Sequence, residues 1–175
     1  MSTILEMLRT LEPESLDDMI DLTAKVINSL VRKGDQNKSI HTQFYPPNNK
    51  LPLISIRDYI HRLFKYSPCS RECFIMSLIY IDRLMLECGL SLNSYNIHRI
   101  LITTLVISTK YQDDIFYNNE FYSQVGGINV QEMNQLELEL LRLLNFSANC
   151  SNDLFIQYSR EIDNLFERNE YMSCT

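Results

Sequence analysis

Hydrophobic residues recur every three or four positions in successive segments of this chain, which is the spacing of one face of an α-helix. Residues 3–11 are predicted to form a short helix, with Thr3 and Glu6 at capping-box spacing. Ser15 and Asp18 repeat that spacing ahead of a second apolar stripe, which Gly34 should end. The stripe comprises Met19, Ile20, Leu22, Val26, Ile27 and Leu30. We therefore expect two helices within residues 1–34.

A polar segment that is rich in proline follows. Residues 35–52 contain three of the five prolines of the chain and are predicted to form an extended linker. Loops of this length are uncommon unless they have a role. Phe44 and Tyr45 lie in the middle of the segment, and we expect them to attach it to the surface of the domain.

Helical periodicity dominates the rest of the chain. Ser55 with Asp58 should cap a helix that Pro68 breaks, and Asn129 with Glu132 should cap another that runs to Phe146. Two segments between them are apolar almost all the way round, and their length of about 18 residues favours buried helices over strands. These segments are 71–88 and 93–111, and a last amphipathic helix is predicted over 153–166. The pattern thus predicts five helices from residue 55 onward.

Composition supports an all-α fold. The chain has 175 residues, of which 45% are hydrophobic and 22% charged, which is ordinary for a globular domain. Only four glycines occur, and no proline follows Pro68, so hairpins and tight turns are disfavoured. Two of the glycines, Gly126 and Gly127, are adjacent and predict a turn with positive φ. We divide the chain into N-terminal helices (1–34), a linker (35–52), a helical domain (53–168) and a tail (169–175).

Charge and cysteine content exclude several classes of protein. The net charge of −6 disfavours electrostatic binding of nucleic acid. The five cysteines include no CxxC pair, which fits a reducing compartment better than a disulfide framework. No apolar run approaches the length of a membrane span, and the N-terminus lacks the basic residues of a signal peptide. The sequence therefore predicts a soluble intracellular protein, cytoplasmic or nuclear, without a membrane partner.

Catalytic and cofactor-binding motifs are absent from the sequence. There is no P-loop, GxGxxG, GxSxG or HExxH motif, so we expect neither an enzyme nor a bound cofactor. Cys69 and Cys73 have the spacing of half a metal site, but no pair of histidines or cysteines supplies the other half. Inert, half-buried thiols are the preferred interpretation, and no metal is expected.

Two acidic residues lie on apolar helix faces. Glu137 lies on the same face as Met133, Leu140 and Leu141. A carboxylate in that position either sits at the rim with its head in water or forms an ion pair. The candidate partner is Lys110, which is the only lysine or arginine between residues 100 and 125.

Asp82 interrupts the most apolar predicted helix. Arg57 and Arg62 on the preceding helix are its candidate partners, and we expect this salt bridge to be architectural. Together with Lys65 and Arg71, these arginines give that helix and its exit a basic bias. Such clusters are mostly solvated faces. A docking site for acidic or phosphorylated groups is the less common alternative.

Four stretches of the chain, taken in order, resemble the cyclins, and most closely the PHO-type cyclins, also called P- or U-type. The stretches are ISIRDYIHRL (54–63), LIYIDRL (78–84), STKYQDD (108–114) and YSQVGGINVQEMNQLELELLRLLNF (122–146). The last is the most specific. Together they cover one cyclin box, at about residues 50–150. The resemblance implies an all-α fold, a five-helix cyclin box with additional N-terminal helices.

The resemblance also implies roles for individual residues. In cyclins, the residues that match Lys110 and Glu137 hold the regulatory helix of a cyclin-dependent kinase. The matching positions that form the apolar part of the same surface are Tyr111, Leu138, Leu141 and Phe146. Asp113 and Asp114 fall where cyclins are acidic and face a basic residue of the kinase activation segment. Asp82 matches the aspartate of an internal salt bridge.

One departure from the family pattern concerns the start of the first box helix. Many cell-cycle cyclins carry a Met-Arg pair there, whereas this chain has Leu53 and Ile54. Arg57 or Arg62 would have to replace the missing arginine, and the substrate-docking patch of those cyclins cannot be assumed. The expected function is that of a regulatory subunit that binds and activates a cyclin-dependent protein kinase as a heterodimer. The alternative is a cyclin-fold transcription-type adaptor without kinase activation.

Overall fold

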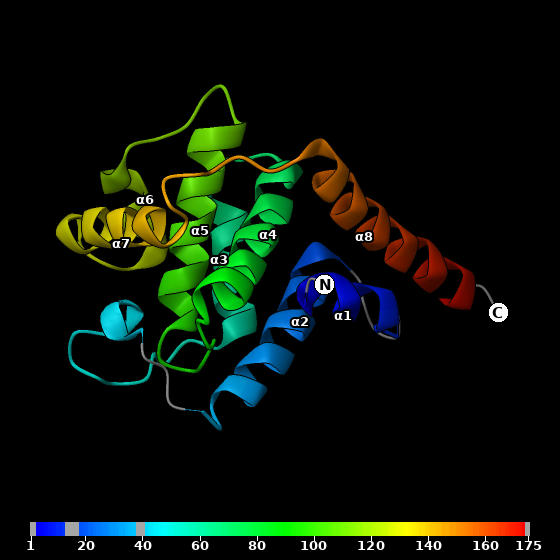
Figure 1. The fold of residues 1–175 in the computed structure, drawn as a ribbon, viewed down its shortest axis with the longest axis horizontal. Coiled ribbons are helices and arrows are strands. Elements are labelled where there is room, and N and C mark those ends of the chain that lie inside the picture. Colours follow the sequence, from blue (N-terminus) through cyan, green and yellow to red (C-terminus); the bar gives the residue numbers. More distant parts are fainter. Residues whose placement is uncertain (1–2, 13–17, 38–40, 174–175) are drawn as a thin grey trace.

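The computed structural model describes residues 3–12, 18–37 and 41–173, with side chains up to residue 170. These residues form eight α-helices and one short 3₁₀ helix, and no strand occurs among them (Figure 1). The elements are α1 (Thr3–Thr10), α2 (Met19–Gly34), η1 (Thr42–Phe44), α3 (Ile56–Tyr66), α4 (Arg71–Cys88), α5 (Ile97–Gln112), α6 (Asn119–Gly126), α7 (Val130–Leu143) and α8 (Asn152–Ser173). The predicted all-α class is confirmed.

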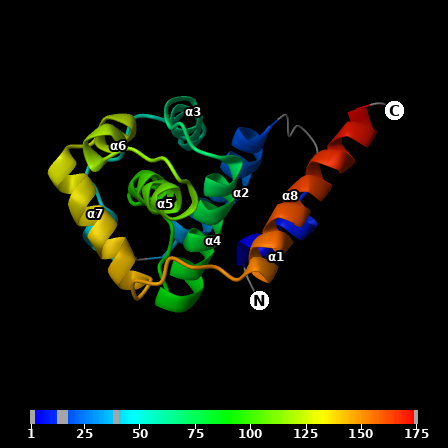
Figure 2. The same cartoon turned by 90° about the horizontal axis from the view of Figure 1, so that it is seen from above.

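Helix α5 is the centre of the molecule. Twelve of its sixteen residues are buried, and it packs against α3, α4, α6 and α7. Figure 2 shows α5 almost end-on, with those four helices around it. Helix α4 is also buried on most sides, because α1 and α8 cover the face that α5 does not contact. The two segments predicted to be central helices therefore occupy the centre, as a helix that is apolar all round requires.

Helices α3 to α7 form the five-helix arrangement. The number of helices after residue 55 differs from the number that the sequence predicted. Six helices follow residue 55, because α6 was not predicted as a helix. It has only eight residues, and tertiary packing and caps at both ends hold it in place. Asn118 Oδ1 accepts from the Phe121 backbone N–H, and Gly127, with φ of 71°, ends the helix. Gly127 thus confirms the predicted positive-φ turn, while Gly126 is the last helical residue.

The ends of the other helices follow local capping chemistry. Ser55 Oγ accepts from the Asp58 N–H, and Asn129 Oδ1 accepts from the Glu132 N–H, as predicted. Asp18 is the N-cap of α2, and the alternative cap Ser15 lies outside the described residues. Helix α7 ends at Leu143, three residues earlier than predicted.

Helices α1 and α8 form an extension beside the five-helix arrangement (Figure 1). Helix α8 continues to Ser173, past the predicted end at residue 166, so residues 169–173 of the expected tail are helical. Its apolar stripe contains Tyr158, Ile162 and Leu165, which are fully buried. This stripe packs against α1 and α4, so the last helix belongs to the same core.

The aromatic residues of the proline-rich segment attach it to the helical bundle. Phe44 is completely buried, and η1 contacts both α5 and α7. The Tyr45 ring stacks on Tyr95 with 5.4 Å between ring centroids, and its hydroxyl accepts from Asn93 Nδ2. The predicted attachment through Phe44 and Tyr45 is confirmed.

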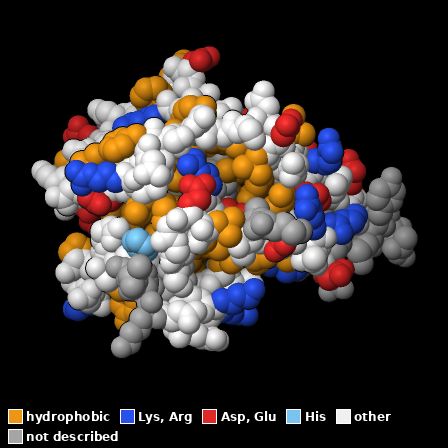
Figure 3. All heavy atoms as spheres, viewed as in Figure 1, with side chains coloured by type: hydrophobic (Ala, Val, Ile, Leu, Met, Phe, Trp, Pro, Cys, Tyr) orange, Lys and Arg blue, Asp and Glu red, His pale blue; other side chains and the backbone are white. Residues whose placement is uncertain are grey.

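The surface of the molecule is mixed in character. Acidic, basic and hydrophobic side chains are interspersed on the face drawn in Figure 3, and basic groups do not gather into one field there. Within the described ranges, no helix combines the length and the apolar character that crossing a bilayer requires.

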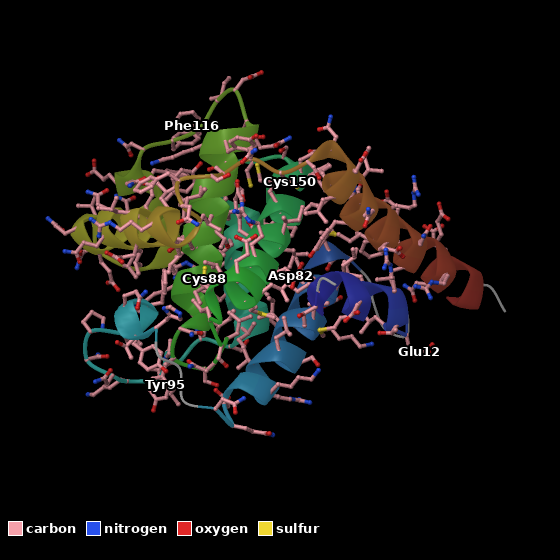
Figure 4. All side chains as sticks on the ribbon, viewed as in Figure 1. Glu12, Asp82, Cys88, Tyr95, Phe116 and Cys150 are labelled. Carbon is pink, nitrogen blue, oxygen red and sulfur yellow. The ribbon has the colours of Figure 1, made fainter. Side chains whose placement is uncertain are left out.

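The predicted salt bridge of Asp82 is wrong. The Asp82 carboxylate lies between α4 and α1 (Figure 4), where it accepts from the Ile4 backbone N–H at 3.1 Å and from the Tyr158 hydroxyl. Arg57 instead pairs with Asp21 on α2 at 2.7 Å, and Arg62 donates to backbone carbonyls of α6. Asp82 therefore caps α1, whose first N–H groups have no partner within their own helix.

Candidate partner-binding surface

Lys110 and Glu137 meet at one end of the bundle. Lys110 lies in the last turn of α5, and its Nζ donates to Glu137 Oε1 of α7 at 2.7 Å. Asn119, the first residue of α6, joins them, because its Oδ1 accepts from Lys110 Nζ at 2.7 Å and its Nδ2 donates to Glu137 Oε2 at 2.6 Å. Of the two interpretations of Glu137, the structure thus gives the ion pair. It links three helices.

The pair is partly accessible to solvent. The side chains of Lys110 and Glu137 are 28% and 17% exposed. A lysine has three N–H donors, and two of these are used by Asn119 and Glu137. A carboxylate has about four acceptor sites, of which the neighbours occupy two. Both groups are therefore held in place and retain hydrogen-bonding capacity for another molecule.

The position of Glu137 depends on how α7 packs across α5. Met133, Leu136 and Leu140 are buried against the core. At the start of α7, Glu132 forms an ion pair with Arg99 of α5. These contacts fix the rotation of α7, so the face that carries Glu137 turns toward the C-terminal end of α5.

Exposed apolar side chains adjoin the ion pair in the sequence. Tyr111 is 49% and Leu138 41% exposed, whereas Leu141 is half-buried. Phe146 is 65% exposed and has a φ of 53°, an uncommon conformation for a bulky residue. Its N–H donates to the Leu141 carbonyl at 2.7 Å, which holds the chain in this left-handed turn and leaves the ring outside. Where such side chains form one contiguous apolar patch, the patch marks an interaction surface.

The loop between α5 and α6 adds residues that the sequence interpretation missed. Ile115, Phe116 and Tyr117 are 81%, 49% and 47% exposed, and Figure 4 shows Phe116 on this loop. Tyr117 stacks on Phe121 with 4.3 Å between ring centroids, which supports the loop. The available signal was a cluster of aromatic residues within a polar segment. Asn119 was also missed, since an asparagine at a helix start is normally explained by capping alone.

The two acidic residues after α5 have different environments. Asp113 accepts from the backbone N–H and the hydroxyl of Ser70, at 3.1 and 2.6 Å, and so holds the start of α4. Burial alone would raise the pKa of Asp113, but the hydrogen bonds from Ser70 outweigh it, and the pKa lies below the ordinary value. Asp114 is exposed. Of the two carboxylates, Asp114 is the one presented to solvent.

The two thiols of the cysteine pair differ: Cys69 has the environment of an unreactive thiol, whereas a hydrogen bond with Cys69 lowers the pKa of Cys73, which is buried in the core. A hydrogen bond with Cys73 and burial both raise the pKa of Cys69, which disfavours the thiolate needed for metal binding or nucleophilic attack. Within the ranges that the structure describes, no three histidine, cysteine or acidic side chains are placed to hold a metal ion.

Comparison with known proteins places the chain in a family. A family model described as Cyclin matches residues 9–148. Cyclin-U4-1 of Arabidopsis thaliana is 35% identical over 153 residues, covering 83% of this chain and 75% of that protein. Cyclin-P3-1 of Oryza sativa subsp. japonica is 40% identical over 146 residues, covering 81% and 62%. PHO85 cyclin-7 of Saccharomyces cerevisiae is 31% identical over 170 residues, covering 82% and 59%.

The matches extend over most of this chain, which itself spans between 59% and 75% of the length of these relatives. They include the plant P and U types and a yeast PHO85 cyclin, in agreement with the helical architecture around α5. The chain therefore belongs to the cyclin family and is a PHO-type cyclin, a regulatory protein.

Proposed function

We propose that this chain binds a cyclin-dependent protein kinase and activates it by holding the regulatory helix of the kinase in the active position. The observation that carries the proposal is the Lys110–Glu137 pair, which is fixed by Asn119, is partly exposed and has exposed apolar residues next to it in the sequence. The resemblance assigns this pair to the kinase contact. The relatives that this chain matches are named as cyclins, among them PHO85 cyclin-7, which also supports a cyclin-dependent kinase as the partner.

The proposed mechanism is a shift between two conformations of the kinase. In the inactive form the regulatory helix is displaced, and the Lys–Glu ion pair that catalysis needs is broken. A protein that binds only the active form shifts the population by its difference in affinity for the two forms. Moving the ratio from 1:99 to 99:1 requires about 5.5 kcal/mol.

The surface offers the groups that such a difference in affinity requires. Lys110 and Glu137 can hydrogen-bond polar groups of the kinase helix only when that helix has swung in against them. Tyr111, Leu138 and Phe146 supply apolar contact, and permanent complexes commonly bury about 2,000 Å² or more. Asp114 is free to meet a basic residue of the kinase activation segment, whereas Asp113 is committed to Ser70.

An affinity purification tests the proposal. The tagged chain would be expressed in cells of its own organism, and the recovered proteins identified by mass spectrometry and assayed for histone phosphorylation. We expect a protein kinase to co-purify, and its activity after separate purification to rise when the chain is added back. Recovery of no kinase, or of a kinase that the chain does not activate, would contradict the proposal.

A further inference from the structure

The surface has a hollow between α3 and α6. Figure 2 shows these two helices side by side at one edge of the bundle. The hollow has a volume of about 570 Å³. Its lining includes His61, Arg62 and Lys65 of α3, together with the aromatic rings of Tyr66 and Phe121. None of the described residues that line it is acidic.

Arg62 is held rigidly in this pocket. Its Nε donates to the Val125 carbonyl at 2.7 Å, and one Nη donates to the Gln124 carbonyl at 2.9 Å. These carbonyls belong to the last turn of α6, where an arginine also interacts favourably with the helix dipole. A guanidinium carries five N–H donors, so three remain for a ligand. Their orientation is set before any ligand arrives.

His61 and Lys65 complete the basic side of the pocket. They are four residues apart on α3 and therefore project from the same face of the helix. Both are exposed, and within the described residues neither makes an ion pair or a conventional hydrogen bond. The Lys65 ammonium lies 5.1 Å from the centre of the Tyr66 ring, which orients it by a cation–π contact.

We propose that this pocket binds the phosphate of a phosphoserine or phosphothreonine in a segment of a partner protein. Arg62 and Lys65 provide two permanent positive charges, which match the charge of about −1.5 to −2 on a phosphomonoester near neutral pH. A planar, pre-oriented guanidinium suits phosphate oxygens in particular. The rings of Tyr66 and Phe121 offer an apolar wall for a side chain next to the phosphorylated residue.

Other anionic ligands fit less well. A glutamate or aspartate carries one charge and two oxygens, which leaves part of the positive charge in the pocket unmatched. The net charge of −6 on the whole chain opposes extended binding to nucleic acid or to an anionic membrane. A single phosphate inside a confined basic pocket is much less affected by that distant charge, because salt screens it.

The pocket uses the C-terminal turn of α6, whereas the ion-pair network uses Asn119 at the N-terminus of the same helix. The inference does not depend on the proposed kinase role, since it is tested on the isolated chain. If both proposals hold, the pocket would recruit proteins that already carry a phosphate to the kinase complex.

Fluorescence polarisation with labelled peptide pools tests the inference. One pool has a fixed central phosphoserine and randomised flanks, and matched pools carry serine or glutamate at that position. We expect the phosphorylated pool to bind about tenfold more tightly than either matched pool, the effect of one to two charge-assisted hydrogen bonds. Inorganic phosphate should compete with it.

Two variants with the same change of charge locate the site. Lys65→Glu should weaken binding of the phosphorylated pool about tenfold or more. Lys33→Glu, on the exposed end of α2, should leave binding unchanged. Circular dichroism melts confirm that both variants are folded.

Several outcomes would overturn the inference. They are equal binding of the phosphorylated and serine pools, equal binding of the glutamate pool, or equal losses in Lys65→Glu and Lys33→Glu. If the chain binds vesicles of phosphatidylcholine with a phosphoinositide more tightly than it binds the phosphorylated peptide pool, the pocket is assigned to a membrane instead.

Discussion

Glu137 shows how a carboxylate is accommodated on an apolar helix face. Removing a charge from water is unfavourable unless the charge is paired and hydrogen-bonded. Here the ammonium of Lys110 and the amide of Asn119 supply both, and the partial exposure of the pair lowers the desolvation penalty. Solvent-exposed pairs contribute only about 0–1 kcal/mol to folding, and the partial exposure of this pair moves it toward that range. Its value to the protein therefore lies in what it presents to a partner.

This reasoning predicts separate effects on binding and stability. Lys110→Ala and Glu137→Gln should each weaken kinase binding by about 2 kcal/mol, as expected of a central interface residue. Their melting temperatures should change little. Calorimetric titration with the co-purified kinase and circular dichroism melts measure the two effects.

Glu139→Gln is the matched control on the same helix, because Glu139 forms an exposed pair with Arg142. Normal binding by both test variants would show that the kinase binds elsewhere. Unfolding of both would show that the pair is structural.

Asp82 makes a different contribution, since it is buried and stabilises the fold. It is 2% exposed, and its partners are the start of α1 and the Tyr158 hydroxyl of α8. Burial raises the pKa of Asp82 above its ordinary value, although hydrogen bonds from Tyr158 and from the Ile4 backbone oppose the shift. The folded state therefore binds a proton at this carboxyl more readily than the unfolded chain does.

The sign of the resulting pH dependence follows from linkage. A pKa that is raised on folding contributes stability below the unfolded value of about 3.9, and this contribution declines as the pH rises through the folded-state pKa. Asp82→Asn removes the titration. We expect the free energy of unfolding of the wild type, minus that of Asp82→Asn, to be larger near pH 4 than near pH 7 in urea denaturation. Asp163→Asn, at an exposed carboxylate on α8, is the control.

Among the helices, the C-terminal end of α2 is fixed by the loop that connects α4 to α5. The α4–α5 loop passes directly over Gly34, where a Cβ atom would lie 1.6 Å from the Leu92 carbonyl oxygen. Asp35 secures the same contact by accepting from the N–H and the hydroxyl of Ser94, both at 2.7 Å. Gly34 ends α2 as predicted, but its glycine is needed for close approach and not for a left-handed turn.

Two alanine substitutions distinguish these roles of glycine. Gly34→Ala should lower the free energy of unfolding by about 3 kcal/mol, because backbone must move to admit the methyl group. Gly89→Ala should cost only about 1 kcal/mol, since Gly89 has a φ of 65° but open space around it. Urea denaturation of both variants measures the difference. Equal losses would mean that the α2 end adjusts freely.

For the molecule as a whole, net charge distinguishes the kinase regulator from the adaptor alternative. A cyclin-fold adaptor that touches DNA needs a basic surface, whereas this chain carries a charge of −6, and the face in Figure 3 mixes both signs. Of the basic side chains of α3, His61, Arg62 and Lys65 line one pocket, whereas Arg57 pairs with Asp21 of α2.

We therefore expect no binding of the chain to random duplex DNA at physiological salt. An electrophoretic mobility shift assay at several salt concentrations tests this, with a basic DNA-binding protein as the positive control. Binding that weakens steeply as salt increases would favour the adaptor, because such a slope reports release of counterions from phosphates.

Short-range patterns in the chain were sufficient for the all-α class, the two central helices and several caps, including Ser55 and Asn129. They also indicated the pairing of Lys110 with Glu137, because Glu137 lies on an apolar helix face and Lys110 is the only lysine or arginine between residues 100 and 125. These features depend on residues within a few turns of each other or on a unique candidate.

Tertiary packing decided the remaining features. Asp82 had several candidate partners and bonds to α1 and α8 instead, and Asp113 turns inward to Ser70. Helix α6 is too short to be stable alone, so its packing and caps define it. The basic pocket exists because α6 lies beside α3 and orients Arg62. Each of these outcomes depends on which remote elements become neighbours, and periodicity along the chain carries no information about that.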